Sequence, residues 1–419
     1  MVVKAKAKEV GSMIRARRVS RVIWIMVAIL MGVLSACGEE AGPSVTPQAT
    51  APRGEPYKVG YMADVTGPGA NTWAPTLEGF RLYVQYINAR GGINGHPIQL
   101  VSADNRSDAS LAAAQAKKFI ESDRVHIILQ SSASVTQQPV IEQAQSAGLP
   151  FVIVEVGCTP PAFPPNPQRN VFCPLLAPQY DNEAFVRFIK AQADKLGRPV
   201  KVVGVAYDVP SSRSGVEYGI RRAQELGLEV VDQIVVPVRG YDHNAIASRI
   251  ISKGADWVFG WGTWEHTGGP LLEALRRQGW QGGFVAPPLS IAESEMARMK
   301  DDKMFTGRHV VMSFDDVPGM RDLKDAYQRF GATFPPDRLI WGWVAGMMAA
   351  AAFERCGWPC TPQQLTEVMQ TLSVDTKGIT GAPIAFTPTD HVGQPLYRFY
   401  AWDRAQGRLA IAQDWTSIR

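Results

Sequence analysis

Residues 57–105 read YKVGYMADVTGPGANTWAPTLEGFRLYVQYINARGGINGHPIQLVSADN, and their pattern decides the fold. The mostly apolar run at 57–64 predicts a buried strand, and a glycine-rich loop follows it. Apolar residues then recur at helical spacing over 77–87, until the glycines at 91–92 end the helix. Residues 98–105 predict a second strand. A strand, a helix and a strand with short connections are typical of a parallel sheet.

The same alternation continues along the chain. Further strands are predicted at 125–129, 149–156, 201–208, 228–236, 256–261 and 284–288, with extended stretches at 307–314, 395–403 and 407–415. Further helices are predicted at 111–122, 138–147, 182–196, 216–226, 245–252, 270–278, 322–330 and 341–355. A proline-rich segment at 159–170 interrupts the rhythm. We therefore expect an α/β fold with parallel-rich sheets covered by helices on both faces.

The interruption at 159–170 and the extended stretches near the end predict two Rossmann-like lobes joined by a multi-strand hinge. The expected bounds are 57–173 plus 309–390 for lobe 1, and 174–308 plus 391–419 for lobe 2. Two lobes joined by several crossings predict a cleft that closes on a ligand.

Residues 1–36 have the order of a secretory signal peptide. Seven basic residues come first, an apolar run follows at 22–34, and small residues precede Cys37. The apolar run is too short to span a bilayer comfortably, although an uncleaved anchor helix is the alternative. The tetrapeptide LSAC at 34–37 resembles the bacterial lipoprotein box, which implies that Cys37 carries the lipid. Residues 37–56, rich in Pro, Ala, Thr and Gly, then form a flexible tether.

The charge of the mature chain argues against nucleic acid as a partner. The whole chain has a formal net charge of +4, with 43 basic and 39 acidic residues. Removing residues 1–36 takes away seven basic residues and one acidic residue, which leaves a net charge of −2. A broad positive field, which nucleic-acid binding needs, therefore disappears with the signal peptide.

The cysteines that remain after Cys37 suggest disulfides. They are Cys158, Cys173, Cys356 and Cys360, and an even number in an exported chain favours bridges. Three pairings are possible, and sequence proximity favours Cys158–Cys173 and Cys356–Cys360. No histidine lies near the second pair, and its spacing is not that of a redox motif. We therefore expect neither a metal nor redox chemistry there.

The stretch at 57–105 and the serine-rich SSASVTQQP at 131–139 together resemble the branched-chain amino acid-binding family of type I periplasmic solute-binding proteins. INARGGINGHPIQL at 87–100 is especially close to that family's pattern, and the resemblance extends over most of the chain from Tyr57 onward. It implies a two-lobe receptor that captures a small-molecule ligand and delivers it to the permease subunits of an ABC importer. We expect a monomer on the outer face of the cell membrane, held only by its lipid anchor.

The resemblance implies a binding function without a cofactor. The sequence contains no GxSxG, HExxH or P-loop motif and no complete GxGxxG, so we do not expect an enzyme. A module that senses a ligand for a membrane signalling partner is the alternative function, as is a receptor for an amide or urea-type solute.

Candidate ligand contacts in the first lobe follow its strands. The family binds the ligand carboxylate with a serine loop, which implies contacts from Ser134 and Ser132 here. Cys158 and Thr159 resemble the family's Gly-Ala-Thr loop, with Cys in place of Ala. Trp73 stands where the family often has an aromatic residue. Helix capping and packing are the alternative roles for these residues.

Candidate contacts in the second lobe are Ser212, Arg213 and Trp264, and Phe314 is a further candidate at the second crossing between the lobes. Where the family commonly has Tyr-Gly, this chain has Ser212 and Arg213, and Arg213 either binds an anionic ligand or is solvated. Trp264 matches an aromatic residue that covers the ligand in the family. Phe314 either adds an apolar wall or packs at the hinge.

Trp264 stands in a short loop that also contains two polar side chains. The loop at 260–269 reads GWGTWEHTGG. Glu265 and His266 favour capping of the next helix over metal binding, because no further ligands stand at suitable spacing.

The segment after the predicted strand 284–288 departs from the family. Amino acid binders of the family usually have an acid here that pairs with the ligand ammonium, whereas this chain has no acid before Glu293. We therefore expect a small carboxylate-bearing ligand, and the missing acid favours an aromatic or branched acid without an α-amine over the alternative of an amino acid. Asp208 and Glu265 are the alternative partners for an amine.

Overall fold

The protein is described here by a computed structural model that covers residues 52–155, 157–175, 177–237, 240–260 and 268–418. These residues belong to one compact unit, Ala49–Arg419. The signal peptide, Cys37 and most of the tether lie outside the described residues, as do Trp264, Glu265 and His266.

Five strands of the described chain form the first sheet. They are β1 (Tyr57–Ala63), β2 (Ile98–Asp104), β3 (Ile127–Ser131), β4 (Phe151–Ile153) and β5 (Val171–Phe172). The order across the sheet is β2-β1-β3-β4-β5, and all of these strands are parallel. Their carboxyl ends therefore meet at one edge, where parallel α/β sheets place their ligand sites.

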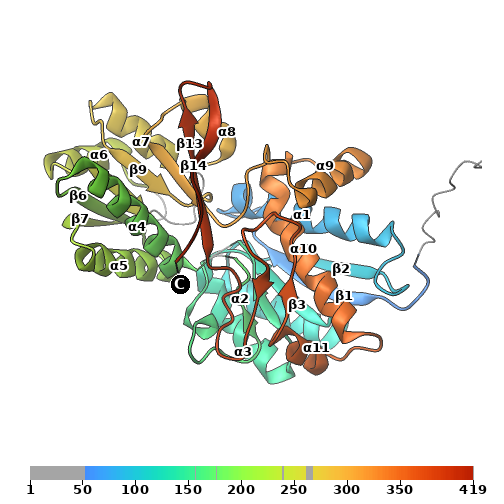
Figure 1. The fold of residues 1–419 in the computed structure, drawn as a ribbon. Coiled ribbons are helices and arrows are strands. Elements are labelled where there is room, and N and C mark those ends of the chain that lie inside the picture. The colour runs from blue at the N-terminus through green and yellow to red at the C-terminus, as the bar shows by residue number, and fades with distance from the viewer. Residues whose placement is uncertain (1–51, 156, 176, 238–239, 261–267, 419) are drawn as a thin grey trace, which may run out of the picture. The chain divides into compact units, whose positions relative to one another are not determined.

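Helices cover both faces of the first sheet (Figure 1). They are α1 (Ala70–Asn88), α2 (Ala109–Lys118), α3 (Gln137–Ala147), α9 (Pro318–Phe330), α10 (Pro336–Cys356) and α11 (Pro362–Met369). Along β1 the side chains alternate between the two faces. Tyr61 packs into one cluster with residues of α1 and α10, and Met62 packs into another with residues of α2 and α3.

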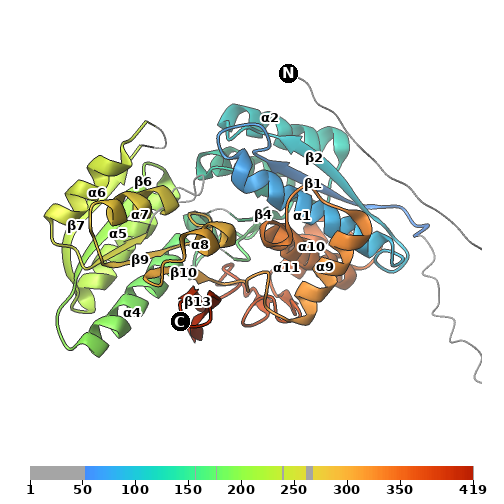
Figure 2. The ribbon, with the colours of Figure 1, turned by 90° about the horizontal axis from the view of Figure 1, so that it is seen from above.

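Helices α1 and α10 cross in close contact (Figure 2), and two glycines make this possible. A β-carbon at Gly342 would overlap the carbonyl oxygen of Thr76, and one at Gly79 would overlap the carbonyl oxygen of Leu339. The crossing brings the first turn of α10 next to the first turn of α1, where the Arg338 guanidinium donates to a backbone carbonyl of α1.

The second sheet contains seven strands of the described chain. They are β6 (Lys201–Tyr207), β7 (Glu229–Val236), β8 (Trp257–Gly260), β9 (Gly283–Ala286), β10 (Met304–Arg308), β13 (Leu396–Asp403) and β14 (Arg408–Ser417). The order is β14-β13-β10-β9-β8-β6-β7. β13 and β14 pair antiparallel at one edge, and the other five strands are parallel.

The second sheet is also covered on both faces. Its helices are α4 (Pro178–Leu196), α5 (Pro210–Glu225), α6 (His243–Ser252), α7 (Gly268–Arg277) and α8 (Glu293–Met299). Side chains of α4 and α5 pack into one cluster with the sheet, and side chains of α6, α7 and α8 pack into another. The predicted α/β class with two parallel-rich sheets is therefore confirmed, while the exact lobe bounds stay a prediction.

Several predicted elements differ locally from the structure. The extended stretch expected at 307–314 overlaps the observed strand only at its first two residues. Strand β10 begins earlier, at Met304, and ends at Arg308. Helices α8 and α11 are too short to show a helical period in the sequence, and neither was predicted. A small antiparallel pair, β11 (Ser373–Val374) with β12 (Ile384–Ala385), was also missed.

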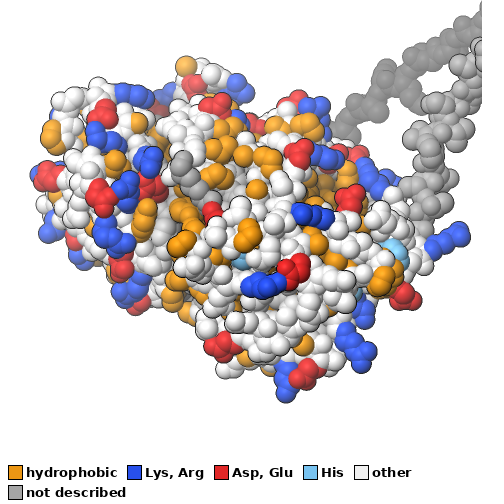
Figure 3. Space-filling view, turned by 60° about the horizontal axis from the view of Figure 1, so that its bottom comes forward, with side chains coloured by type: hydrophobic (Ala, Val, Ile, Leu, Met, Phe, Trp, Pro, Cys, Tyr) orange, Lys and Arg blue, Asp and Glu red, His pale blue; other side chains and the backbone are white. Residues whose placement is uncertain are grey.

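No described helix is long and apolar enough to cross a bilayer. Figure 3 shows Lys, Arg, Asp and Glu side chains intermixed over the visible face, without a continuous basic area.

Candidate functional site

Asp64 organises the loop between β1 and α1. Its carboxylate is fully buried and accepts hydrogen bonds from Gly67 N at 2.7 Å, Gly69 N at 2.9 Å and Ser107 Oγ at 2.7 Å. A β-carbon at Gly69 would overlap the Trp73 ring, so only glycine allows this close approach. The loop thereby fixes the first turn of α1.

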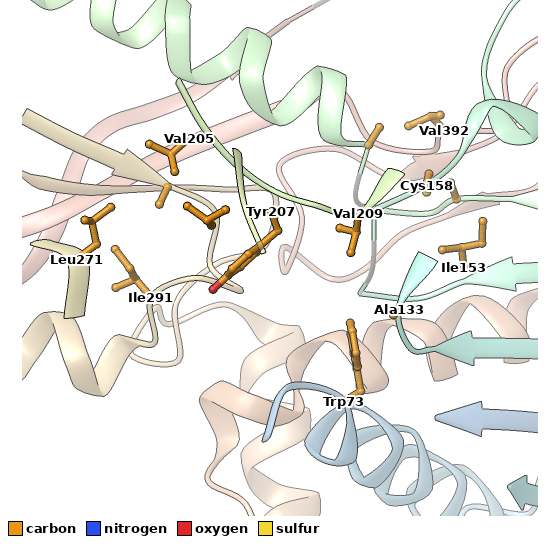
Figure 4. Close-up of a cluster of buried hydrophobic side chains, with 14 of the residues drawn as sticks. Trp73, Ala133, Ile153, Cys158, Val205, Tyr207, Val209, Leu271, Ile291 and Val392 are labelled. Atoms are coloured by element: carbon orange, nitrogen blue, oxygen red, sulfur yellow. A yellow bond between two sulfur atoms is a disulfide. The ribbon is translucent and has the colours of Figure 1, made fainter. Parts of the chain in front are cut away.

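Trp73 lies in that first turn and is fully buried. Its Nε1 donates to the carbonyl oxygen of Glu155 at 2.8 Å, which joins the loop after β1 to the loop after β4. Figure 4 shows the ring pointing from α1 toward Ala133, and the same apolar cluster contains Tyr207 of β6 and Val209, which directly precedes α5. The structure thus places Trp73 among the loops at the carboxyl ends of the strands, and its contact with a ligand stays a prediction.

The two predicted serines of the loop after β3 have different surroundings. Ser132 Oγ accepts from Asn105 Nδ2 at 2.7 Å and shares a hydrogen bond of 2.9 Å with Thr136 Oγ1. Ser134 Oγ instead accepts from Ser211 Oγ at 3.1 Å, and Ser211 belongs to the first turn of α5. Ser134 is therefore the serine that faces the helices of the second sheet.

Ser211 is a residue that sequence reasoning missed, since it named the next serine. Ser212 Oγ accepts from Tyr207 N at 3.0 Å and so closes the turn between β6 and α5. Within the described part of the chain, no side chain caps the N-terminus of α5. The first turn of a helix offers backbone N–H groups to an anion, and Ser211 adds a hydroxyl there.

The loop after β4 is held by a disulfide and a glutamine. The structure pairs Cys158 with Cys173, and it also pairs Cys356 with Cys360, as sequence proximity favours. Thr159 Oγ1 donates to Gln137 Oε1 at 2.8 Å, and Gln137 Nε2 donates to the Gly157 carbonyl at 3.0 Å. Cys158 is buried and bonded, so its thiol is not free to react.

The Cys158–Cys173 bridge ends at a crossing between the sheets. Cys173 N donates to the His391 carbonyl at 2.8 Å, and Gly393 N donates to the Cys173 carbonyl at 2.9 Å. Residues 391–393 lead directly into β13 of the second sheet. The disulfide therefore connects the candidate ligand loop to a hinge segment.

The remaining candidates of the second lobe and of the second crossing lie nearer the surface. Arg213 Nε donates to Asp208 Oδ1 at 2.6 Å, and both side chains are exposed. The hydrogen bond to Asp208 raises the pKa of Arg213. Phe314 is also exposed and meets the Tyr400 ring edge-on, with 6.0 Å between ring centroids. Trp264 lies outside the described residues, so its role stays a prediction.

A charged cavity adjoins these loops and was not predicted. It is small, with about 20 Å³ of space for the centres of water-sized groups, and it is partly open to solvent. Its lining is Thr72, Glu155, Pro288, Leu289, Ala292, Glu293, Arg308, Asp337, Arg338 and Trp341. Pro288 and Leu289 belong to the segment where the sequence lacks the family's acid. The cavity thus receives carboxyl groups from other elements.

Glu155 is the cavity's most unusual side chain. It follows β4 in a left-handed backbone conformation, with φ of 50°. Burial raises its pKa well above the ordinary value, and the charges of Arg338 and Arg308 only partly oppose this. Sequence reasoning assigned Glu155 to the interior of a strand, and a lone acid in the apolar run FVIVEV was the signal that could have found it.

The family described as "Periplasmic binding protein" matches residues 56–408 of the chain. An amino acid binding protein of Pseudomonas aeruginosa is 24% identical over 305 residues, which cover 71% of this chain and 78% of that protein.

Solved structures share the fold. One is a branched-chain amino acid ABC transporter protein from Thermus thermophilus with bound valine, with a TM-score of 0.77 and 17% identity; the match covers 87% of this chain and 97% of that chain. Another is a solute-binding protein from R. palustris in complex with 4-hydroxybenzoate, with a TM-score of 0.71 and 16% identity, and the same coverage of the two chains. At these identities the likeness shows the two-lobe fold, and the ligands belong to those proteins.

Proposed function

Because the chain belongs to the periplasmic binding protein family, we propose that it captures a small carboxylate-bearing ligand and delivers it to an ABC importer. Members of this family bind solutes and are not enzymes, and the family implies an exported protein. Attachment to the membrane through a lipid on Cys37 is part of the proposal, as is delivery to permease subunits.

The observation that carries the proposal is the meeting of Ser134 with Ser211. These hydroxyls lie 3.1 Å apart and come from the loop after β3 and the first turn of α5. A carboxylate that enters between them would accept from both hydroxyls and from the N-terminus of α5. Charge-assisted hydrogen bonds of this kind are stronger than the hydroxyl pair they replace.

The absence of an acid at 287–290 supports a ligand without an α-amine. The fold takes both kinds of ligand, since one similar structure contains valine and another contains 4-hydroxybenzoate. We therefore propose aromatic or branched acids as the first ligands to test.

A thermal-shift screen of the purified protein tests this proposal. We expect aromatic and branched carboxylates to raise the melting temperature, because a ligand at 100 times its Kd stabilises the native state by about 2.7 kcal/mol. Ser134→Ala should weaken the best hit about tenfold, which corresponds to about 1.4 kcal/mol, or roughly one lost charged hydrogen bond.

Ser248→Ala is the matched control, because this serine lies on an exposed face of α6, where its hydroxyl bonds to the Asn244 carbonyl and to Gln278 Oε1. If leucine or valine gave the largest shift, the proposed absence of an α-amine would be wrong. If no carboxylate of either kind raised the melting temperature, the carboxylate proposal itself would fail.

A further inference from the structure

Three of the residues that line this cavity each contain a buried polar atom without a hydrogen-bond partner among the described residues. The atoms are Thr72 Oγ1, Glu155 Oε2 and Arg308 Nε. The exposed fractions of the three residues are 2%, 6% and 3%. Buried polar groups almost always have partners, so three exceptions in one cavity indicate a missing bonded group.

Neighbouring charged groups of the cavity do have hydrogen-bond partners, so the lack of a partner is particular to these three atoms. Glu293 accepts from Ser313 N at 2.9 Å and from Ser313 Oγ at 2.7 Å, and Arg308 Nη2 lies 3.6 Å from it. The Arg338 guanidinium donates to the Asn71 carbonyl. The three open atoms come from the start of α1, the loop after β4 and the end of β10. They therefore belong to elements of both sheets.

The charges around the cavity favour an uncharged occupant. A second carboxylate would face Glu155, Glu293 and Asp337, whereas an ammonium would face Arg308 and Arg338. Desolvating either ion beside like charges is costly. A neutral polar group avoids both penalties.

The three unpartnered atoms also determine which donors and acceptors a group bound in the cavity must have. Arg308 Nε can only donate, so the occupant must carry an acceptor. Thr72 Oγ1 can accept or donate. Glu155 can do both as well when its carboxyl is neutral, and burial of that carboxyl raises its pKa. A group with a carbonyl oxygen and N–H donors matches this set.

We propose that this cavity is a subsite for a primary amide at the far end of the ligand, with Thr72, Glu155 and Arg308 as specificity-determining residues. The inference rests on the proposed function, in which the Ser134 loop binds the carboxylate end. Trp73 connects the two regions, because it follows Thr72 in α1 and its Nε1 bonds the Glu155 carbonyl. The ligand class is then the monoamide of a short dicarboxylic acid.

Calorimetric binding of matched acids tests the subsite. The probes are succinamate, glutaramate and adipamate, each beside its apolar isostere: 4-methylpentanoate, 5-methylhexanoate or 6-methylheptanoate. We expect one monoamide to bind roughly 10- to 100-fold more tightly than its isostere, as two or three net hydrogen bonds would give. The corresponding dicarboxylate and ω-amino acid should bind more weakly than the monoamide.

Two variants assign the preference to the cavity. Glu155→Met and Thr72→Val keep the volume but remove the open polar atoms, so the ratio of amide to isostere affinity should fall toward one. Their melting temperatures should not fall, because an unpartnered buried polar group does not stabilise the fold. Thr76→Val is the control, since Thr76 is buried one turn further along α1 and donates to the Thr72 carbonyl outside the cavity.

The outcomes separate this inference from the proposed function. If acids bind regardless of their far end, or if Glu155→Met and Thr72→Val keep the wild-type ratio, the subsite is refuted and the carboxylate site stands. If none of these acids, nor the aromatic and branched acids, binds, the carboxylate proposal fails and the inference fails with it.

Discussion

The polar clusters on the two sides of Trp73 are built in opposite ways. In the loop after β1, the Asp64 carboxylate accepts three hydrogen bonds and is fully used within the protein. In the charged cavity, Thr72, Glu155 and Arg308 each bury an atom that has no hydrogen-bond partner among the residues that the structure describes. The first cluster holds the shape of the site. The second is the proposed subsite, where the unpartnered atoms can still form hydrogen bonds with a ligand. Such atoms make a site selective, because a ligand without the matching polar group leaves them unpaired.

The largest effect should follow from breaking the satisfied cluster. Asp64→Ala leaves the N–H groups of Gly67 and Gly69 and the Ser107 hydroxyl without their acceptor. We expect a loss of about 3–5 kcal/mol in the free energy of unfolding, measured by urea denaturation, because each unsatisfied buried donor costs roughly 1–3 kcal/mol.

Asp108→Ala is the control for the Asp64 variant. Asp108 caps α2 by accepting from Leu111 N at 2.7 Å at an exposed position, so its loss should cost only about 1 kcal/mol. Equal losses for the two variants would contradict the special position assigned to Asp64.

An intermediate effect should appear in the pH dependence of stability. The folded-state pKa of Glu155 is raised above the ordinary value of 4.5, so above that pH the folded protein binds more protons than the unfolded chain. Stability should therefore fall as the pH rises above about 4.5, with a slope from this group of at most about 1.4 kcal/mol per pH unit. Glu155→Gln should flatten this part of the profile, measured by urea denaturation between pH 4 and pH 8.

Glu183 offers a comparison of opposite sign. Burial would raise its pKa, but hydrogen bonds from Arg222 and Arg187 outweigh burial and lower it. Its contribution is present above pH 4.5 and is lost as the pH falls. Glu183→Gln should therefore remove a rise of the free energy of unfolding with pH, whereas Glu155→Gln should remove a fall. The same change of slope in both variants would refute the unpartnered state of Glu155.

The smallest effect should follow from Arg213→Ala. Its partner Asp208 is exposed, and such pairs contribute little because water already solvates both charges. We expect neither the melting temperature nor the affinity for the best acid to change measurably. A large loss of affinity would show that Arg213 leaves Asp208 to bind the ligand, and it would restore the alternative raised from the sequence.

The fold was predictable because its signals are local. Apolar runs and helical periods along 57–105 indicate the strands and helix that the structure contains, and the stretch at 87–100 resembled the family that the comparison confirms. The two-residue strands β11 and β12 and the eight-residue helix α11 carry too little periodicity to be seen. The antiparallel edge at β13 and β14 was indicated only as two extended stretches.

The site was less predictable because it depends on direction and distance. The sequence predicted that this helix begins at residue 216, whereas α5 begins at Pro210. Its first turn decides that Ser211 reaches Ser134 while Ser212 bonds back to the end of β6. The cavity brings Glu155 and Arg308 together from segments more than 150 residues apart in the chain. A local sequence pattern cannot predict a contact between segments so far apart in the chain.

The disulfide between Cys158 and Cys173 also has a consequence for where the receptor becomes competent. Thiols in the bacterial cytoplasm are kept reduced, and disulfides persist in compartments beyond it. The loop that carries Thr159 is therefore fastened to its hinge segment only after secretion. A chain still inside the cell lacks this fastening, so oxidation in the outer compartment completes the proposed binding loop where the solute is found.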